Sequence, residues 1–400
     1  MATVEGSTIV ARSLKEQGVE VIFGLVGGPV IEVFGAANEY GIRNIGVRHE
    51  QAAVMMAQAY GYVGGRVGVA LLASGPAVTN GLTGIHVAWD NCWPLVVLGG
   101  SSSLRQRGRG AFQEAESVAM AAPITKWAVQ VDNPRRIPEY IAKAFRIALS
   151  GRPGPVYLDL PSDVLHESID EEAARPAPRV EPAPPPQADP DAVKRAVDLL
   201  QRAQRPVLII GKGVRWSEPY QELRELVEGL SIPFVTSPMG RGYLPDDHPL
   251  CFQSARGMAL READVALIVG ARLNWMFNFG RSIGPEAKLI QIDVAPEEIG
   301  SNRPTDVGLV GDARAVLRQI LNEVAQAGAP SRTAETPWLD QLRQSRAKNE
   351  ATIEPLLTSD AVPMTHHRLL REVRDAIPRE SILTVDGQIV LATGRQVLNT

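Results

Sequence analysis

Apolar residues in the first part of the chain follow two alternating patterns. Short, continuous apolar runs predict buried strands at residues 19–25, 44–47, 67–73, 95–99 and 156–160. The stretches between them predict helices at residues 8–17, 51–62, 78–89 and 137–149. Strands separated by helices form parallel sheets with helices on both faces, so residues 1–168 are predicted to form one α/β domain. In such a domain the loops after the strands bind ligands.

Prolines interrupt this pattern after residue 168. They recur at positions 176, 178, 182, 184–186 and 190, and they predict an extended, exposed linker over residues 169–190. The alternation then resumes over residues 191–328, where apolar strands are predicted at 207–210, 265–269 and 289–292. A second α/β domain is therefore expected.

The pattern in the last part of the chain predicts the first elements of a third unit. Residues 329–365 are predicted to be a linker and a helix. Within residues 366–400 the apolar run 382–385 predicts a strand, and a helix is predicted to start at Ile389. A single apolar strand needs neighbours that this sequence does not provide, so we expect the sequence to be part of a longer protein.

Composition narrows the classes of function. The chain is 44% hydrophobic and 22% charged, with a formal net charge of −4, which favours neither nucleic acid nor an anionic membrane surface as a partner. Cys92 and Cys251 lie far apart and show no metal-ligand spacing. The first residues do not resemble a signal peptide, and no apolar run could span a bilayer. A cytoplasmic location is expected.

Glu50 stands where a predicted strand runs into a predicted helix. A carboxylate in the first helical turn gains from the helix dipole, which is one sufficient reason for its presence. The alternative is a carboxyl group in a poorly solvated cleft that exchanges a proton with a heterocycle. The local sequence leaves both interpretations open.

The second domain carries a possible nucleotide signal. Gly211-Lys212-Gly213 follows a predicted strand, and Arg272 and Asp293 lie at the ends of two others. Backbone N–H groups of a glycine loop can bind phosphate, and an acid at a strand end can accept hydrogen bonds from ribose. No complete G-x-G-x-x-G occurs in this domain. A simple turn with surface ion pairs explains the pattern equally well.

Five separated motifs carry a resemblance to a known family. They are Arg48-His49-Glu50-Gln51-Ala52-Ala53, Asn91-Cys92-Trp93-Pro94-Leu95 with Gly99-Gly100-Ser101-Ser102, Ala111-Phe112-Gln113-Glu114, Pro238-Met239-Gly240-Arg241-Gly242 and Gly270-Ala271-Arg272-Leu273-Asn274-Trp275. With these motifs the chain resembles the thiamine-diphosphate-dependent enzymes of the pyruvate-oxidase type. The resemblance is closest to their 2-hydroxyacyl-CoA lyase and oxalyl-CoA decarboxylase branch.

The resemblance implies a pyrimidine-binding domain over residues 1–168, a Rossmann-like middle domain over 191–328 and the start of a diphosphate-binding domain over 366–400. The family's Gly-Asp-Gly motif with a downstream Asn, which holds Mg²⁺ and the cofactor's phosphates, is absent from this sequence. Mg²⁺ ligands are thus expected beyond residue 400, and no metal ligand is assigned within the chain. The family also implies a homodimer or homotetramer with the active site at the subunit interface.

The family's catalytic glutamate corresponds to Glu50, which would activate thiamine diphosphate to its ylid. Other catalytic positions implied by the resemblance are Gly28, facing the substrate, and Phe112 and Gln113, on the thiazolium side. The implied cofactor-binding residues are Val26, Gly27, Glu50, Pro76 and Asn80. His49 is given a supporting, structural role.

Two further sets of residues match ligand positions of this branch. Arg256 and Arg395 match positions that meet the phosphates of CoA, although surface ion pairs are an equally good explanation of two arginines. Arg152, Gly211, Lys212, Arg272, Asp293 and Asp312 match a site for ADP.

The resemblance implies a lyase that cleaves 2-hydroxyacyl-CoA to an aldehyde or ketone plus formyl-CoA. Oxalyl-CoA decarboxylase is the nearest alternative and is disfavoured because those enzymes tend to carry Tyr-Glu where this chain has Phe112-Gln113. An acetohydroxyacid-synthase-like enzyme is a third possibility. A nucleotide-binding assembly subunit without catalytic activity is a fourth.

Overall fold

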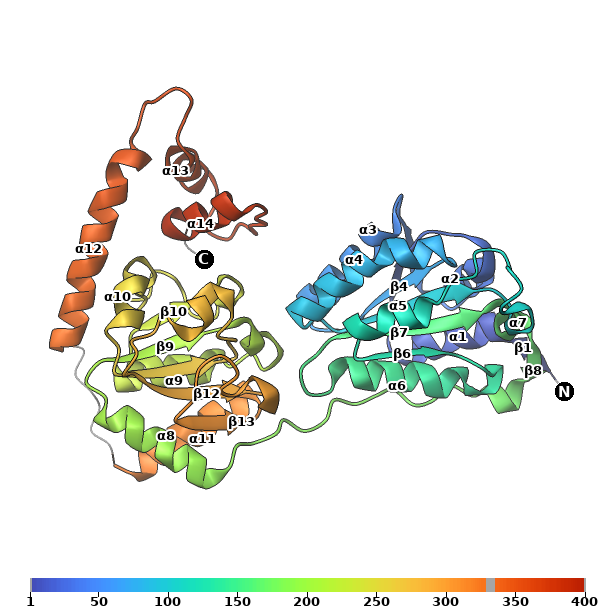
Figure 1. Cartoon of the computed structure of the whole chain (residues 1–400), viewed down its shortest axis with the longest axis horizontal. Coiled ribbons are helices and arrows are strands. Elements are labelled where there is room, and N and C mark those ends of the chain that lie inside the picture. The colour runs from blue at the N-terminus through green and yellow to red at the C-terminus, as the bar shows by residue number, and fades with distance from the viewer. Residues whose placement is uncertain (1, 329–334, 399–400) are drawn as a thin grey trace. The chain divides into compact units, whose positions relative to one another are not determined.

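The structure, a computed structural model, describes residues 2–328 and 335–398. These residues form two compact units, divided between Pro184 and Pro185. In each unit, helices surround a central sheet (Figure 1). The prediction of parallel α/β domains is confirmed, and each unit is described below by itself.

The first unit contains a six-stranded, wholly parallel sheet. Its strands run in the spatial order β3 (Arg43–Gly46), β2 (Val21–Gly24), β4 (Gly68–Leu72), β5 (Leu95–Ser101), β7 (Pro155–Pro161) and β6 (Trp127–Gln130). Every residue of β4 is buried, as expected for a strand covered on both faces. The edge strand β6 was not predicted, because its half-buried Trp-Ala-Val-Gln sequence is not a continuous apolar run.

Two apolar clusters cover the two faces of this sheet (Figure 1). On one face lie α1 (Gly6–Glu16), α2 (Ile31–Glu39) and α6 (Ile137–Leu149). On the other lie α3 (Glu50–Gly64), α4 (Pro76–Asn91) and the short α5 (Ser117–Ala121). Helices thus cover both faces of the sheet, and the ends of its strands remain accessible to ligands.

The start of the proline-rich segment differs from the predicted linker. Strand β8 (Ser168–Asp170) pairs with β1 (Thr3–Glu5), and a 3₁₀ turn follows it at Glu171–Ala174. Further along, the Gln17 amide donates to the carbonyls of Ala177 and Pro178 at 3.2 and 3.1 Å. Prolines lack the backbone N–H that a strand ladder would use, but the backbone carbonyl groups of this segment can still accept hydrogen bonds. The buried side-chain amide of Gln17 therefore holds the extended segment in place.

The second unit contains a five-stranded parallel sheet. The spatial order is β10 (Phe234–Thr236), β9 (Pro206–Ile210), β11 (Val265–Val269), β12 (Lys288–Asp293) and β13 (Val307–Val310). The flanking helices are α8 (Pro190–Arg202), α9 (Tyr220–Leu230), α10 (Arg256–Arg261) and α11 (Ala313–Gln326). The strand order reverses between β9 and β11, which is where nucleotides bind in many such sheets.

Glycines bring the two loops at this reversal into direct contact. A Cβ on Gly211 would lie 2.2 Å from the carbonyl oxygen of Gly270. The N–H groups of Gly211 and Gly213 donate to the carbonyls of Val269 and Gly270, each at 2.9 Å. These glycines are therefore required by close backbone packing.

Three helices follow the second sheet: α12 (Pro337–Leu357), α13 (His366–Ala376) and α14 (Gln388–Val397). Trp338 anchors the start of α12, since it is 3% exposed and its indole N–H donates to the Pro206 carbonyl at 3.0 Å. At the far end, Arg241 forms an ion pair with Asp246 and donates to the carbonyl of Leu398, just after α14. Residues 329–334 of the predicted linker lie outside the described residues.

The strand predicted at residues 382–385 is not formed. The segment has no regular secondary structure, and Ile382 is 94% exposed. An apolar run becomes a strand only where another strand completes its hydrogen-bond ladder, and none pairs with it among the described residues.

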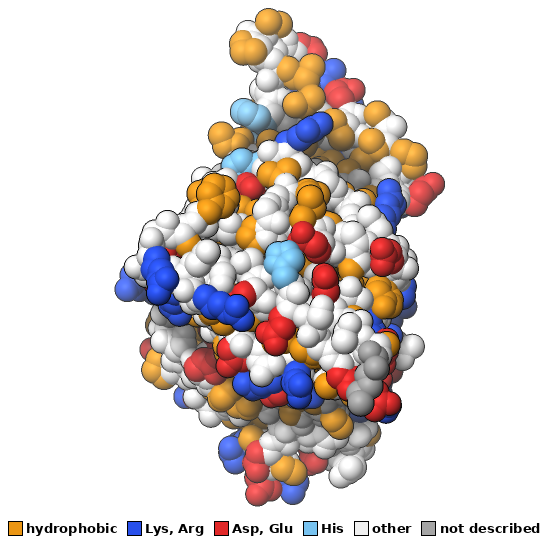
Figure 2. Space-filling model, turned by 90° about the vertical axis from the view of Figure 1, so that its right-hand side faces the viewer, with side chains coloured by type: hydrophobic (Ala, Val, Ile, Leu, Met, Phe, Trp, Pro, Cys, Tyr) orange, Lys and Arg blue, Asp and Glu red, His pale blue; other side chains and the backbone are white. Residues whose placement is uncertain are grey.

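Charges of both signs are interspersed over the face of the molecule shown in Figure 2. This distribution agrees with the small net charge of −4. In the described part of the chain, no helix combines the length and hydropathy needed to cross a membrane.

The contact between Gly211 and Gly270 predicts a stability difference between two glycine substitutions. Gly211→Ala should lower the free energy of unfolding by about 1–3 kcal/mol or more, because backbone atoms cannot move aside easily. Gly229→Ala, in α9 where a Cβ would meet nothing within 4 Å, should raise it by about 0.5–1 kcal/mol. Urea unfolding of the two variants measures both values. Equal stability of the variants would contradict the packing role of Gly211.

Candidate active site

Glu50 is the first residue of α3, directly beyond the carboxyl end of β3. It is only 8% exposed, and its Oε2 accepts a hydrogen bond from the Asn80 amide at 2.9 Å. His49 is the N-cap of the helix, where its Nδ1 accepts from the Gln51 N–H at 3.2 Å. The histidine therefore has the structural role expected of it, and the carboxyl group of Glu50 is held in a buried position.

The loop after β2 lies beside the loop after β4. A Cβ on Gly27 would be 2.9 Å from the Cβ of Ala73, so a larger residue at position 27 would separate the two loops. Gly75 has a φ of +53°, which turns the chain into Pro76, the first residue of α4. This turn sets the position of Asn80 one helical turn later.

Two residues at the start of this site are open to solvent within the first unit. Val26 is 55% exposed. A Cβ on Gly28 would meet nothing within 4 Å, and Gly28 is not among the residues with a left-handed φ. The space beside Gly28 is therefore not filled by residues of its own unit.

Phe112 and Gln113 reach the site on the long loop after β5. The side-chain oxygen of Gln113 accepts a hydrogen bond from the Ser74 hydroxyl at 2.6 Å. A Cβ on Gly75 would lie 2.5 Å from the Gln113 carbonyl oxygen, so this loop closes directly over the turn before α4. Phe112 beside it is 77% exposed. The loop thus presents an amide and an aromatic ring next to the turn that carries Asn80.

Glu114 holds this loop in shape, a role that sequence reasoning missed. Its carboxylate accepts hydrogen bonds from the backbone N–H groups of Gly108, Gly110 and Ala111. The N–H of Gly108, followed by that of Ala111, lowers the pKa of Glu114. The clamp is thus present at neutral pH and is lost as the pH falls through this lowered pKa. Two glycines that precede the Phe112-Gln113 pair were the available sequence signal.

A buried carboxylate secures the end of β5, from which this loop leaves. Asp159, 2% exposed, accepts hydrogen bonds from Ser101, Gln130 and Tyr157 at 2.6, 2.7 and 3.0 Å. Burial, with Asp159 nearby, raises the pKa of Tyr157 well above its usual range. The phenol is therefore a stable donor, and the network fixes β5 to β7 and β6. An aspartate inside an otherwise apolar run was its only sequence signal.

The predicted catalytic and cofactor-binding residues of the first unit thus lie beyond the carboxyl ends of its parallel strands. They follow four strands that are consecutive neighbours in the sheet, in the order β3, β2, β4 and β5. A buried carboxyl group with an amide on one oxygen fits the aminopyrimidine of thiamine diphosphate. The residues that would hold it are Val26, Gly27, Glu50, Pro76 and Asn80. The described residues contain no group of three or more His, Cys, Asp or Glu that could hold a metal ion.

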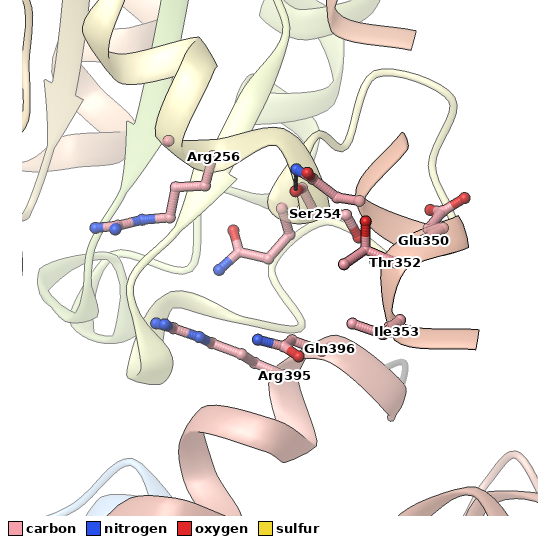
Figure 3. Close-up of a pocket in the computed structure, with 10 residues that line it drawn as sticks. Ser254, Arg256, Glu350, Thr352, Ile353, Arg395 and Gln396 are labelled. Carbon is pink, nitrogen blue, oxygen red and sulfur yellow. Dashed lines mark hydrogen bonds between the residues drawn. The ribbon is translucent and has the colours of Figure 1, made fainter. Parts of the chain in front are cut away.

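In the second unit, Arg256 and Arg395 line one pocket of about 350 Å³ (Figure 3). Arg256 begins α10 and Arg395 belongs to α14, and their guanidinium groups extend to the same side of the pocket. Other lining residues include Ser254, Asn349 and Gln396. The structure therefore brings together two arginines that lie far apart in the sequence.

Glu350 also lines this pocket, but no described acidic side chain lies within ion-pair distance of the two arginines. Burial, followed by the positive charge of Arg395, lowers the pKa of Arg256. The Nε of Arg256 is buried without a hydrogen-bond partner, and neither arginine forms an ion pair with another described residue. Surface ion pairs therefore do not explain this pair. Two guanidinium groups with unused donors suit a ligand that carries several phosphate charges.

The residues predicted to bind ADP are divided between the two units, and their role stays a prediction. Arg152 lies in the first unit, whereas the others lie at the carboxyl ends of strands in the second. Gly211 uses its N–H within the loop contact, and Lys212, Arg272 and Asp293 already take part in interactions within the chain. Asp312 is the N-cap of α11 and accepts a hydrogen bond from the Ser217 hydroxyl at 2.6 Å. The N–H groups of Gly211 and Gly213 are thus used within the chain, and the phosphate role of the glycine loop stays a prediction.

Comparison with known proteins agrees with this arrangement. A family model described as thiamine pyrophosphate enzyme, N-terminal TPP binding domain, matches residues 4–120. A second, described as thiamine pyrophosphate enzyme, central domain, matches residues 193–320. The two matches fall in the first and second units, respectively.

Individual relatives match almost the whole chain. The 2-hydroxyacyl-CoA lyase 1 of Homo sapiens is 38% identical over 397 residues, which cover 99% of this chain and 68% of the relative. The protein of the same name from Mus musculus is 40% identical with the same coverage. Oxalyl-CoA decarboxylase of Escherichia coli (strain K12) is 36% identical over 404 residues, covering 99% of this chain and 71% of the relative. The chain therefore belongs to the family of thiamine-diphosphate-dependent enzymes that includes the 2-hydroxyacyl-CoA lyases and oxalyl-CoA decarboxylases.

Proposed function

We propose that this protein is a thiamine-diphosphate-dependent lyase that cleaves a 2-hydroxyacyl-CoA into an aldehyde or ketone and formyl-CoA. The names of its relatives support the reaction class. The observation that carries the substrate class is the pocket of Arg256 and Arg395, because CoA contains a diphosphate and a ribose phosphate. Its two uncompensated guanidinium groups fit these anions.

Thiamine diphosphate, when bound, supplies a carbanion nucleophile and an electron sink for cleavage of the carbon–carbon bond. The task of Glu50 is to exchange a proton with the ring nitrogen of the aminopyrimidine. Asn80 holds one carboxyl oxygen of Glu50, which leaves the other free to face the heterocycle. A buried, oriented carboxyl group loses little in reorganisation when it transfers a proton.

The loop with Phe112 and Gln113 supports the lyase over the decarboxylase. A neutral amide held by Ser74 stands where oxalyl-CoA decarboxylases tend to carry an acid. The amide of Gln113 differs from that acid in charge and in its ability to donate a hydrogen bond, so this position distinguishes the chain from the decarboxylases. Offering the full-length protein oxalyl-CoA and a 2-hydroxyacyl-CoA tests this assignment. Release of formyl-CoA from oxalyl-CoA alone would establish the decarboxylase instead.

Glu50→Gln should abolish proton exchange while it preserves the fold. The glutamine oxygen can still accept from Asn80, but the side chain no longer ionises. We expect deuterium exchange at C2 of bound thiamine diphosphate to slow by about 10²–10⁴-fold. Glu39→Gln, an exposed change at the end of α2, serves as the control. Exchange at the wild-type rate in Glu50→Gln would contradict the role of Glu50.

Arg256→Ala and Arg395→Ala should each raise the Kd for CoA by about 10–100-fold, because each removes charge-assisted hydrogen bonds. Arg261→Ala, also in α10 but paired with Glu262 at 3.1 Å, should change it little. Isothermal titration calorimetry of the full-length variants with CoA measures the three values. An unchanged Kd in both pocket variants would remove the support for a CoA substrate.

The lack of a side chain at Gly28 predicts a pocket that accepts branched or ketone-derived substrates. Since a Cβ there meets nothing within 4 Å, Gly28→Ala should be tolerated, whereas the larger Gly28→Ile should overlap a second substituent on the reacting carbon. We expect Gly28→Ile to slow cleavage of 2-hydroxyisobutyryl-CoA about tenfold more than cleavage of a straight-chain 2-hydroxyacyl-CoA. Equal slowing of the two substrates, measured as kcat/KM, would refute the pocket.

A further inference from the structure

An exposed apolar loop follows β11 in the second unit. It is the 3₁₀ segment Trp275–Gly280, here called the apolar loop. Trp275 is 68% exposed, Phe279 50% and Met276 36%. Three large apolar side chains on six consecutive residues form a patch rather than scattered exposure, and such patches mark binding surfaces.

The backbone of this loop is strained. Asn278 and Phe279 have φ values of 49° and 54°, so two consecutive residues other than glycine adopt the left-handed region. Asparagine tolerates this region, but a bulky aromatic residue rarely adopts it. Such residues destabilise the folded chain, and strain of this kind is concentrated at ligand sites.

The neighbouring segment holds the loop in this conformation. The Asn302 amide donates to the Leu273 carbonyl at 3.0 Å. The Arg303 guanidinium donates to the carbonyls of Gly280, Ile283, Gly284, Pro285 and Ala287 at 2.7 to 3.2 Å. A cation that satisfies so many carbonyl groups fixes the chain after Phe279 rigidly. The exposed side chains are therefore presented on a firm support.

The apolar loop is continuous with the two-arginine pocket. Arg256 Nη2 donates to the Met276 carbonyl at 3.4 Å. The same guanidinium lies 4.7 Å from the centre of the buried Phe277 ring. Arg256 thus contacts the apolar loop and also lines the pocket, where Figure 3 shows its guanidinium group on the same side as that of Arg395.

We propose that the apolar loop binds the acyl-pantetheine arm of the CoA thioester whose phosphates lie at Arg256 and Arg395. This inference rests on the CoA substrate of the proposed function. The arm is flexible and rich in methyl and methylene groups, which suits a surface of Trp, Met and Phe. Adenine, the other group near the phosphates, needs polar partners for its ring edge. The polar side-chain groups of the exposed loop residues are the Asn278 amide and the Trp275 indole N–H, whereas Met276 and Phe279 present apolar surface only.

Two glycine substitutions separate strain from binding. Phe279→Gly relieves the left-handed strain, so it should raise the thermal unfolding temperature. It also removes the aromatic ring, so it should weaken the binding of hexanoyl-CoA about tenfold. Asn278→Gly relieves strain at the adjacent residue without removing an apolar side chain. It should raise or preserve the unfolding temperature and leave the Kd for hexanoyl-CoA unchanged. Equal affinity in the two variants would overturn the proposal.

A second pair of ligands identifies which part of CoA the loop contacts. In the full-length protein, Trp275→Ala should weaken hexanoyl-CoA about tenfold but leave adenosine 3′,5′-bisphosphate, which lacks the arm, within twofold. Val310→Ala, an exposed apolar change on β13, is the control and should affect neither ligand. Equal weakening of both ligands by Trp275→Ala would place adenine on the loop and overturn the proposal, as would no change in either.

The same titrations distinguish failure of the proposal from failure of the proposed function. If the wild type binds both ligands and Arg256→Ala weakens both, the CoA assignment holds and the loop variants decide the inference. If the wild type binds neither ligand, the CoA assignment fails and the inference falls with it.

Discussion

A parallel sheet enclosed on both faces leaves few places for polar chemistry. In the central strands of the first unit, such as β4, the residues are buried and the backbone groups are used in the ladders, so reactive side chains are expected at the strand ends. Glu50 follows β3 and Asn80 belongs to the helix after β4, yet the parallel arrangement brings them to 2.9 Å. The rest of the candidate active site depends on this constraint, because every loop that contributes to it leaves the same edge.

The loops beyond these strand ends are held by groups that are not among the predicted cofactor-binding residues. Glu114 gathers three backbone N–H groups, and Asp159 gathers three side-chain donors at the base of the same loop. Such support matters because a small displacement of a catalytic group weakens its action strongly. The exposed Phe112 and the amide of Gln113 can therefore lie on a long loop and still be well positioned.

In the second unit, by contrast, two charged side chains lack ion-pair partners among the described residues and one loop has a strained backbone. Arg256 and Arg395 remain uncompensated, and Phe279 keeps an unfavourable backbone conformation next to them. Neither feature stabilises the folded chain. Both become understandable if an anionic ligand with an apolar arm neutralises the arginines and covers the exposed rings, since strain and unpaired charge concentrate at sites of function. By contrast Arg303, whose donors are satisfied by five carbonyl groups, is structural.

Local patterns in the sequence were enough to predict the parallel α/β architecture and the place of Glu50 at a helix start. Continuous apolar runs such as Val265–Val269 and the change of period after β3 depend on neighbouring residues alone. The family resemblance added the candidate residues Gln113, Arg256 and Arg395. Contacts between distant segments were decided by the tertiary structure. Strand β8 needs β1, residues 382–385 find no such partner among the described residues, and Arg395 becomes part of a site only beside Arg256. A glycine loop such as Gly211-Lys212-Gly213 can bind phosphate or admit another backbone. Only the position of Gly270, set by the pairing of β9 with β11, determined that here it admits a backbone.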